Sequence, residues 1–316
     1  SLSLSDALQK ALENNYGIII SKSDGKVAEI NNTWGTAGRY PTIGFTASSN
    51  NNAELINNTS TNSITGGLNL SWTLFNGFKV IATKNKLAQY EELAKGRTGV
   101  VVENTIQDVI LGYYNILLQK ERLDVLKTLM KLSEDRYKYE QTKYEIGGSV
   151  TYNVLLAKNV YLDDKAAYLN QEVVVRNAIR NLNFLLGEEP NAHWVISQEF
   201  KSDTAEFKLG DLLEKMMASN QTLQNQYINL VIQQEEIKTQ KSAWYPKVSL
   251  SAGINNSYAW YDPQSSLGHP VKGLTPYGNV SLSYDIFRAG NRKAAIDIAK
   301  IDAEITQIET DEIKHS

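Results

Sequence analysis

The chain of 316 residues is predicted to be an α+β protein in which strand pairs alternate with very long coiled-coil helices, and in which this arrangement occurs twice. Three observations predict this class. Blocks of sequence recur in the same order. Strict alternation of apolar and polar residues follows a Tyr-Pro pair in each copy, and an apolar residue recurs every seven positions through a long segment without proline.

The duplication rests on three pairs of similar segments. LSDALQKALENN aligns with LGDLLEKMMASN, RYPTIGFTAS aligns with WYPKVSLSAG without a gap, and GLNLSWTLFNGFK aligns with NVSLSYDIFRAG. The paired segments begin at Leu4 and Leu209, at Arg39 and Trp244, and at Gly67 and Asn279. We therefore predict a first repeat over residues 1–200 and a second over 205–316. The second repeat is expected to be incomplete, because its long helix stops soon after it begins.

Each repeat is predicted to open with helices that lead to a Tyr-Pro pair. The predicted helices are 5–15, 18–38 and 209–243, the last with a candidate break near Asn220. Ser5 or Asp6 is placed to cap the first of them. Pro41 restricts the backbone of Tyr40, so the second helix is expected to stop before this pair.

Strands are predicted where the period changes to two, over about 41–50, 64–75, 247–258 and 277–287. On the second strand Leu68, Leu70 and Trp72 share one face, and Asn69, Ser71 and Thr73 share the other. On the fourth, Val280, Leu282 and Tyr284 oppose Ser281 and Ser283. Such alternation fits a soluble sheet with one face on a core, and it also fits a membrane barrel. The small, uncharged polar faces favour the barrel slightly.

A helical hairpin is predicted over residues 79–187, with its turn at IGGSV. Residues spaced by seven form one stripe on each arm: Ile81, Ala88, Lys95, Val102, Val109, Ile116, Leu123, Met130, Tyr137 and Tyr144, then Val154, Tyr161, Tyr168, Val175 and Leu182. Only Lys95 interrupts the apolar character. A period of seven sustained this far predicts supercoiling against copies of the same chain or against a partner. Gly187 is placed to end the second arm, and residues 290–316 begin the corresponding long helix of the second repeat.

The composition argues against several classes of function. The formal net charge is −3 and no basic block stands out, so nucleic acid is not an expected partner. Cysteine is absent, and the three histidines lack ligand-like neighbours at metal spacing. We find no nucleophile–base pair and no phosphate-binding glycine loop, and therefore expect no enzyme, no cofactor and no metal. No apolar run approaches the ~18 residues of a membrane helix.

Taken in order, these segments resemble the TolC-type outer-membrane efflux and secretion factors. SLSDALQKALENN is similar to the family's opening helix, and LSWTLFNGFK and LSYDIFRAGNRK to its strand-to-helix turns. YEIGGSVTYNVLLAKNVYLDDKAAY resembles its hairpin tip, and AIRNLNFLLGEEP the end of its first repeat. The resemblance implies a homotrimer in the outer membrane of a Gram-negative-type bacterium. In it, four strands per subunit form one barrel, and the helices form a periplasmic tunnel.

The resemblance also implies a passive duct that is linked to an inner-membrane transporter by a periplasmic adaptor. The turn expected to contact the adaptor is formed by Gly147, Gly148, Ser149, Val150 and Thr151. The lumen-facing residues would be Asn69, Ser71, Thr73, Ser281 and Ser283, and the lipid-facing residues Leu68, Leu70, Trp72, Val280, Leu282 and Tyr284. The alternative is a non-transporting periplasmic scaffold or adaptor, in which the Leu70 face of the strands packs on a protein core.

Overall fold

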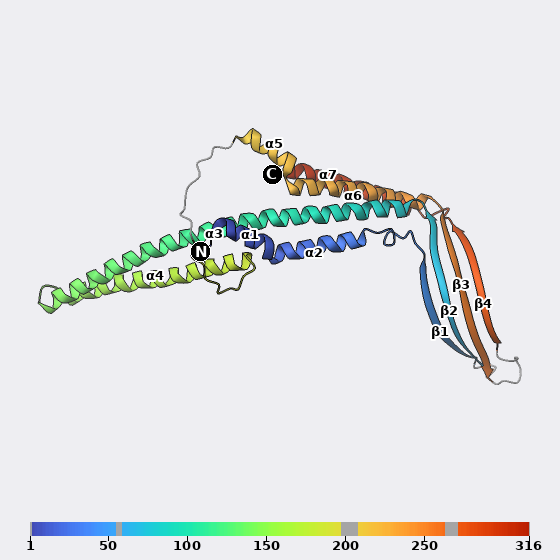
Figure 1. Ribbon diagram of the computed structural model, residues 1–316, viewed down its shortest axis with the longest axis horizontal. Helices are drawn as coiled ribbons and strands as arrows, with labels where there is room; N and C mark the ends of the chain where they lie inside the picture. The colour runs from blue at the N-terminus through green and yellow to red at the C-terminus, as the bar shows by residue number, and fades with distance from the viewer. Residues whose placement is uncertain (1, 55–58, 197–207, 263–270, 316) are drawn as a thin grey trace. The chain divides into compact units, whose positions relative to one another are not determined.

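The computed structural model describes residues 2–54, 59–196, 208–262 and 271–315 (Figure 1). Two compact units divide the chain. Unit 1 comprises Ser1–Asp24 and Arg97–Ala218, and unit 2 comprises Gly25–Gly96 and Ser219–Ser316. These units do not coincide with the predicted repeats 1–200 and 205–316, because residues 25–96 of the first repeat fall in unit 2 and residues 205–218 of the second fall in unit 1.

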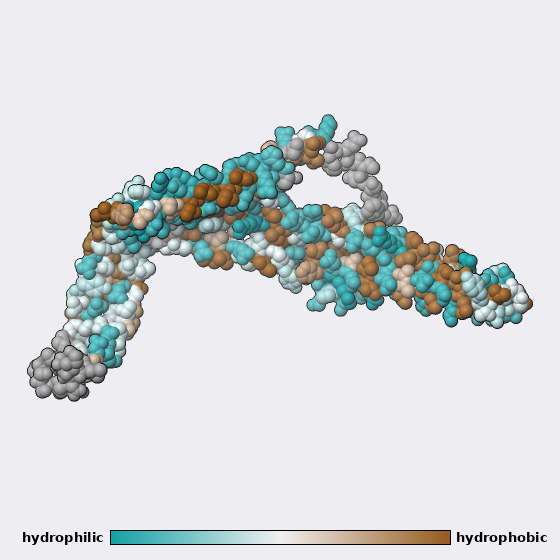
Figure 2. Space-filling view, turned by 180° about the vertical axis from the view of Figure 1, so that it is seen from behind, coloured by the Kyte–Doolittle hydropathy of each residue, from teal (hydrophilic) through white to brown (hydrophobic). Residues whose placement is uncertain are grey.

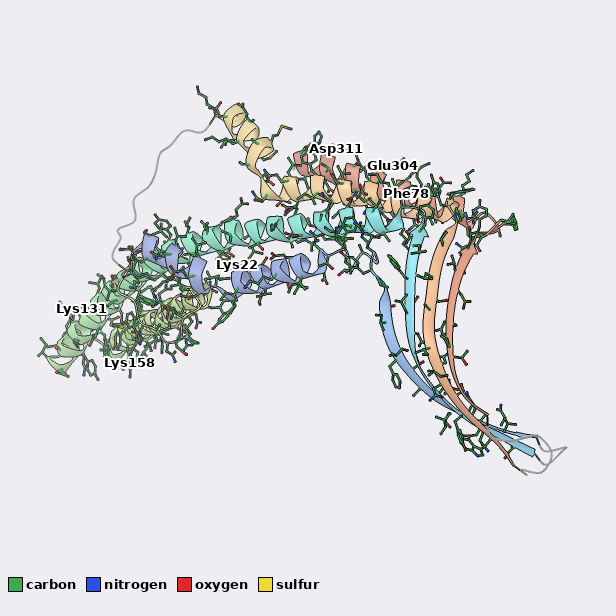
Figure 3. All side chains as sticks on the ribbon, turned by 45° about the vertical axis from the view of Figure 1, so that its right-hand side comes forward. Lys22, Phe78, Lys131, Lys158, Glu304 and Asp311 are labelled. Atoms are coloured by element: carbon green, nitrogen blue, oxygen red, sulfur yellow. The ribbon has the colours of Figure 1, made fainter. Side chains whose placement is uncertain are left out.

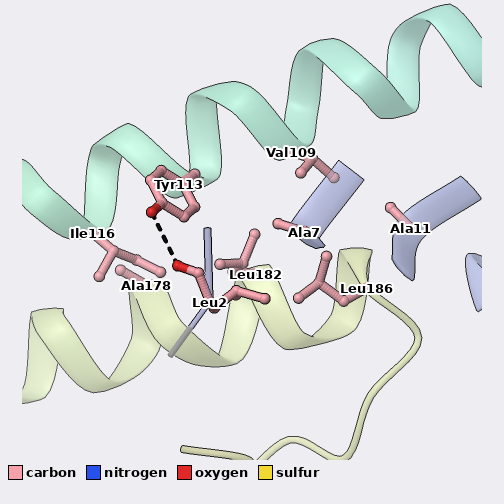
Figure 4. Packing of buried hydrophobic residues seen from close by; sticks show 9 residues of the cluster. All are labelled: Leu2, Ala7, Ala11, Val109, Tyr113, Ile116, Ala178, Leu182 and Leu186. Carbon is pink, nitrogen blue, oxygen red and sulfur yellow. Dashed lines mark hydrogen bonds between the residues drawn. The ribbon is translucent and has the colours of Figure 1, made fainter. Parts of the chain in front are cut away.

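Unit 1 is built around a helical hairpin. Helix α3 (Lys79–Glu145) has 67 residues and starts in unit 2. At ~1.5 Å per residue it is about 100 Å long. It is followed by α4 (Thr151–Leu185), and α1 (Leu4–Asn14) packs where α4 ends. The buried side chains of the three helices form the core in Figure 4: Leu2, Ala7, Ala11, Val109, Tyr113, Ile116, Ala178, Leu182 and Leu186. Within it, the Tyr113 hydroxyl donates to the backbone oxygen of Leu2 at 3.1 Å.

The first two helices end differently from the sequence prediction. Ser3, rather than Ser5 or Asp6, caps α1, because its Oγ accepts from the backbone N–H of Asp6 while the Asp6 carboxylate accepts from the N–H of Ser3. Helix α2 (Tyr16–Asn31) stops well before Gly38. The reason is local: the hydroxyl of Thr33 accepts from the N–H of Thr36, which favours a turn over helix.

The predicted seven-residue stripes face each other in the hairpin. The rings of Tyr137 and Tyr161 stack with centroids 6.2 Å apart and an interplanar angle of 5°. The side-chain amides of Gln119 and Gln171 are joined by a hydrogen bond of 2.9 Å. A second stripe at the same spacing is exposed on α3, and comprises Leu111, Leu118, Val125, Leu132 and Tyr139. This second stripe has the pattern of a coiled-coil seam without a partner in the described part of the chain.

Unit 2 contains one antiparallel sheet in the order β1-β2-β3-β4. The strands are β1 (Thr42–Glu54), β2 (Thr59–Asn76), β3 (Lys247–Asp262) and β4 (Val271–Ser283). Ile43 pairs with Leu70, and their repeat counterparts Val248 and Leu282 pair in the same way. The two hairpins therefore share one register, as expected of duplicated units. Within the described residues, β1 and β4 are left as open edges.

The fourth strand is shorter at its end than predicted. Its last pair joins Ser283 to Lys247, which follows Pro246 and is the first residue of β3. Tyr284 therefore has no ladder partner on β3 and lies outside the strand, which corrects its predicted place. In β2 a bulge between Thr73 and Phe75 moves the position opposite Val248 from Leu74 to Phe75.

The remaining helices belong to the second repeat. They are α5 (Leu209–Ser219), α6 (Gln221–Lys241), the short 3₁₀ helix η1 (Ser242–Trp244) and α7 (Asn291–His315). The predicted break at Asn220 is confirmed, since its side chain accepts from the N–H of Leu223 and caps α6. Helix α7 packs along α6, and hydrophobic residues form a brown row on this part of the chain in Figure 2. The exposed isoleucines of α7 are Ile298, Ile301, Ile305 and Ile308. None of the described helices is both long and apolar enough to cross a membrane.

The turn from strand to long helix has the same unusual backbone in both repeats. Gly77 and Phe78 have φ of 68° and 67°, and their counterparts Ala289 and Gly290 have φ of 47° and 80°. A left-handed Phe costs about 1–2 kcal/mol. The ring contacts of Phe78 with Phe75 and Tyr245, at 5.3 and 5.8 Å, offset this cost at about 0.5–1.5 kcal/mol each.

Replacing the glycine of this turn is expected to be costly. In Gly77→Ala the new Cβ would lie 2.3 Å from the backbone oxygen of Ser242, in addition to the strain of positive φ. We expect the substitution to lower the free energy of unfolding by about 3 kcal/mol. Thermal unfolding of the purified full chain measures it. Gly25→Ala is the matched control, because nothing lies within 4 Å and α2 should gain about 0.5–1 kcal/mol. Equal unfolding midpoints of the two variants would show that the backbone of Gly77 does not need a glycine.

Candidate functional site

The sheet has one apolar face, assembled from all four strands. Pairing across the ladder places Phe45 beside Leu68 and Leu68 beside Ile254, and it places Trp72 beside Leu250 and Leu250 beside Val280. The predicted residues Leu68, Leu70, Trp72, Val280 and Leu282 thus share this face. Several of its side chains are half or more exposed: Ile43 72%, Phe45 71%, Leu68 52%, Val280 69% and Leu282 70%. No element of the described chain covers them as a core would.

On β3 this apolar face runs from Val248 to Tyr258, with Asn256 as its polar residue. The distance is about 33 Å along the strand at ~3.3 Å per residue. Aromatic residues stand at both ends of the face. Tyr258 and Trp260 lie 5.5 Å apart at one end. At the other, the indole N–H of Trp72 donates to the backbone oxygen of Arg39 at 2.8 Å.

The opposite, polar face carries small uncharged side chains. It includes the predicted residues Asn69, Ser71, Thr73, Ser281 and Ser283. On β2, Asn69 pairs with Gly253, Ser71 with Ser251 and Thr73 with Ser249. On β4, Ser281 pairs with Ser249 from the other side, and Ser283 pairs with Lys247. Side chains leave the sheet on both faces in Figure 3. A chain of hydrogen bonds crosses the sheet on the polar face: Tyr277 donates to Asn69 at 3.2 Å, and Asn69 donates to Thr46 at 3.0 Å. A Cβ on Gly253 would lie only 2.8 Å from the ring of Tyr277, so the absence of a side chain at Gly253 lets the tyrosine ring lie close against the sheet.

The strand-to-helix turns bound both faces. Phe75, Phe78 and Tyr245 form three edge-on contacts with centroids 5.3 to 6.4 Å apart, and Phe78 lies where β2 meets α3 (Figure 3). On the helices next to them, Lys86 binds Glu236 at 2.7 Å. This hydrogen bond lowers the pKa of the Glu236 carboxyl, so the pair contributes stability above the unfolded-state pKa and loses it as the pH falls through the folded-state pKa.

The tip of the hairpin is a compact turn. Gly147 has φ of 79°, its N–H donates to the backbone oxygen of Tyr144, and the N–H of Gly148 donates to that of Lys143. These bonds satisfy the last carbonyls of α3 and reverse the chain. Ser149 donates to Glu140 at 2.8 Å. The side chain of Val150 is 60% exposed, and Gly147, Gly148 and Thr151 are also exposed. The five predicted tip residues therefore lie together, and four of them are open to solvent.

Sequence reasoning missed the backbone of the strand-to-helix turns and the Tyr277–Asn69 hydrogen bonds. The sequence did hold a signal for the positive φ of the turns. Gly77 aligns with Ala289 and Phe78 with Gly290, so each position holds a glycine, the residue that favours positive φ, in one of the two copies. The Tyr277–Asn69 hydrogen bonds depend on a register that no local pattern gives. Among the described residues no group of His, Cys, Asp and Glu could hold a metal ion.

Comparison with solved structures finds the same fold. A membrane protein from Pseudomonas aeruginosa aligns with a TM-score of 0.73 at 16% identity, over 99% of this chain and 73% of that one. The Campylobacter jejuni CmeC outer membrane channel aligns at 0.71 and 16% identity, over 98% and 67%. The Neisseria gonorrhoeae MtrE outer membrane channel in its open state aligns at 0.69 and 17%, over 99% and 70%. Among curated proteins, none matches the sequence.

The family model described as outer membrane efflux protein matches residues 7–188, which cover α1 through the end of the α3–α4 hairpin and include β1 and β2. These are the elements that carry the first copy of both sheet faces and the tip. The matched residues are more than half of the chain. The chain therefore belongs to the outer membrane efflux protein family.

Proposed function

We propose that three copies of this chain close a twelve-stranded barrel in the outer membrane and extend it with their helices into a periplasmic tunnel. Membership of the family makes the chain part of an outer-membrane efflux duct rather than an enzyme. The observation that carries the proposal is the sheet, which is duplicated in register, apolar on one face, polar on the other, and open at β1 and β4. Joining β4 of one copy to β1 of the next removes the open edges.

The dimensions of the apolar face support a place in lipid. A strand length of about 33 Å, tilted by ~40° as in small barrels, covers about 25 Å of height. This is the height of the apolar band of outer-membrane barrels, and the aromatic pair Tyr258–Trp260 and Trp72 stand at its two ends, where interface residues belong. The polar face would then line a wet lumen.

The exposed stripes on the helices support the tunnel. Leu111, Leu118, Val125, Leu132 and Tyr139 repeat every seven residues on α3 and are 49 to 67% exposed. A neighbouring copy would bury them in the same coiled-coil manner in which Tyr137 of α3 packs on Tyr161 of α4. The periplasmic scaffold is not favoured, since it would need a protein core over the apolar face, and the described residues provide none.

The accessibility of the two sheet faces tests the duct directly. The chain has no cysteine, so Leu70→Cys and Ser71→Cys each give a single reporter in the full-length protein. In isolated outer membranes we expect a water-soluble maleimide to label position 71 but to label position 70 only after denaturation. A lipid-phase probe should label 70 and so exclude protection by protein. Strong native labelling at 70, or recovery of the protein without detergent, would refute the barrel.

The tip is proposed to contact the periplasmic adaptor that links the duct to an inner-membrane transporter. Val150 offers an exposed apolar side chain there, beside Gly147 and Gly148. We expect Val150→Asp to weaken adaptor binding by about tenfold, because it places a desolvated charge in the contact. Val195→Asp is the control, since Val195 is 71% exposed and lies away from the tip. Equal binding of both variants, measured by co-purification and surface plasmon resonance, would remove the tip from the interface.

A further inference from the structure

A basic cavity lies at the end of the polar face. It has a volume of about 260 Å³ and is lined by residues of β3, the end of β4 and the starts of α3 and α7. Its described lining carries four basic side chains and one acidic one: Lys79, Lys247, Arg288, Arg292 and Asp285. This balance stands out in a chain whose formal net charge is −3. Opposed only by Asp285, the four cations make the cavity strongly positive.

Arg292 lines this cavity and is only 8% exposed. Its Nη2 donates to the backbone oxygen of Asp285, and its guanidinium lies 5.4 Å from the ring of Trp244 and 5.2 Å from that of Tyr284. Its Nε is buried and has no acceptor among the described residues. A buried guanidinium without a counter-charge is costly, so the site favours an anion.

The carboxylates near the cavity are already engaged. Asp285 binds Arg288 at 3.2 Å. Glu236, which lies close enough to Lys79 to be affected by its charge, is bound by Lys86 at 2.7 Å and by Gln240 at 2.6 Å. In the described part of the chain no ion pair joins Lys79, Lys247 or Arg292 to a carboxylate. Helix α7 begins beside them at Asn291, and its N-terminal end adds partial positive charge.

The position of the cavity relative to the polar face gives it a role. In the strand rows between Asn52 and the cavity, Lys247 is the only charged residue on that face. A cargo on the polar face would therefore meet concentrated charge at this cavity. Walls of low dielectric that carry one sign of charge raise the local concentration of ions of the other sign.

We propose that this cavity binds an oxyanion, of the phosphate, sulfate or carboxylate class, and that it gives the duct a preference for anionic cargo. The inference rests on the proposed lumen. The oxyanion could belong to a soluble cargo or to the headgroup of an anionic membrane phospholipid. The chemistry is shared by both sources, and the experiment separates them.

The first measurement is ion selectivity of the full-length protein in planar bilayers. We compare the wild type with the combined variant Lys79→Gln, Lys247→Gln and Arg288→Gln, which leaves the buried Arg292 in place. The control variant Lys22→Gln, Lys127→Gln and Lys293→Gln removes as many charges from exposed positions outside the cavity. We expect the ratio of anion to cation permeability to fall by about fivefold or more in the first variant and to stay unchanged in the control.

The second measurement is a calorimetric titration with inorganic pyrophosphate. The protein is placed in vesicles of phosphatidylcholine alone and in vesicles that also contain phosphatidylglycerol. We expect saturable binding to the wild type, and we expect this binding to weaken by about tenfold for each charge-assisted hydrogen bond that the combined variant removes. Both lipids carry a phosphate, but only the phosphatidylglycerol headgroup has a net negative charge. Equal binding in both vesicles therefore identifies a soluble anion as the ligand, and binding only without phosphatidylglycerol identifies the anionic phospholipid headgroup.

The outcomes separate this site from the duct. Absence of saturable pyrophosphate binding in both vesicles, together with unchanged selectivity, would overturn the site while conductance still supported the duct. Binding that is abolished in the variant without a change in selectivity would keep the site and refute its role in cargo preference. A wild type that does not conduct would refute the duct. The pyrophosphate titration would then still show whether the cavity binds an oxyanion.

Discussion

The combined variant Ser48→Cys and Ser281→Cys is expected to form disulfide-linked multimers of the full chain on oxidation in outer membranes. The repeat sets this pairing. Asn69 pairs with Gly253 between β2 and β3. Their counterparts in the other copy are Ser281 on β4 and Ser48 on β1, by the same alignment that relates the registers of the two hairpins. If β4 of one copy meets β1 of the next as β3 meets β2, these two residues lie directly opposite each other.

The two cysteines cannot react within one chain. They are on the two edge strands of a four-stranded sheet, which lie about 14 Å apart at ~4.8 Å per strand, and Ser48 lies in the row of Gly273, eight residues along β4 from Ser281. A disulfide needs Cα atoms within about 7 Å. Nearly complete conversion to a covalent trimer is therefore the expected result, seen on a non-reducing gel. Ser281→Cys with Thr46→Cys is the control, because a slip of two residues on the same face separates the Cα atoms by about 7–8 Å. Cross-linking that is equal or stronger in the control would show that this register is wrong, and monomers in both would contradict barrel closure.

Much of this architecture could be predicted because the strands, the helical hairpin and the repeats each leave a recognisable pattern in the sequence. Alternation with period two gave the strands and their faces, and spacing by seven gave the hairpin. The stacking of Tyr137 on Tyr161 within the hairpin was not predicted, because the stripes were expected to pack on another copy or a partner. The aligned segments predicted the duplication, which the equal registers of Ile43–Leu70 and Val248–Leu282 confirm. The two periods depend on residues that are close in sequence, and the duplication can be found by comparing one segment of the chain with another.

What could not be predicted depends on residues far apart in the chain. Tyr284 has the right alternation for a strand, but it lies beyond the first residue of the partner strand, so its place was decided by Pro246 rather than by its neighbours. The basic cavity unites Lys79 with Lys247 and Arg292, which lie on three elements and form no charge run in the sequence. The left-handed Phe78 is tolerated because Tyr245, far along the chain, packs against its ring.

A large effect on stability is also expected from a charge on the apolar face. Leu68 lies near the middle of the band, between Phe45 and Ile254, and 52% of its side chain is exposed in the chain. If lipid covers this face, Leu68→Arg should cost about 2–4 kcal/mol, as arginine does near the midplane of outer-membrane barrels. If the face were simply in water, an arginine at so exposed a site should change the free energy of unfolding by less than about 0.5 kcal/mol.

Ser71→Arg is the matched control for this substitution. Ser71 is exposed on the polar face of the same strand, one row nearer the strand-to-helix turn than Leu70. An arginine there would project into water, and we expect folding to stay within about 0.5 kcal/mol of the wild type. Folding into lipid vesicles, followed by urea titration, measures both variants. A large loss for Leu68→Arg alone requires hydrocarbon on one face and water on the other, which is the arrangement that a duct through a membrane must have. Equal losses for both variants would place protein on the two faces and leave no lumen for cargo to cross.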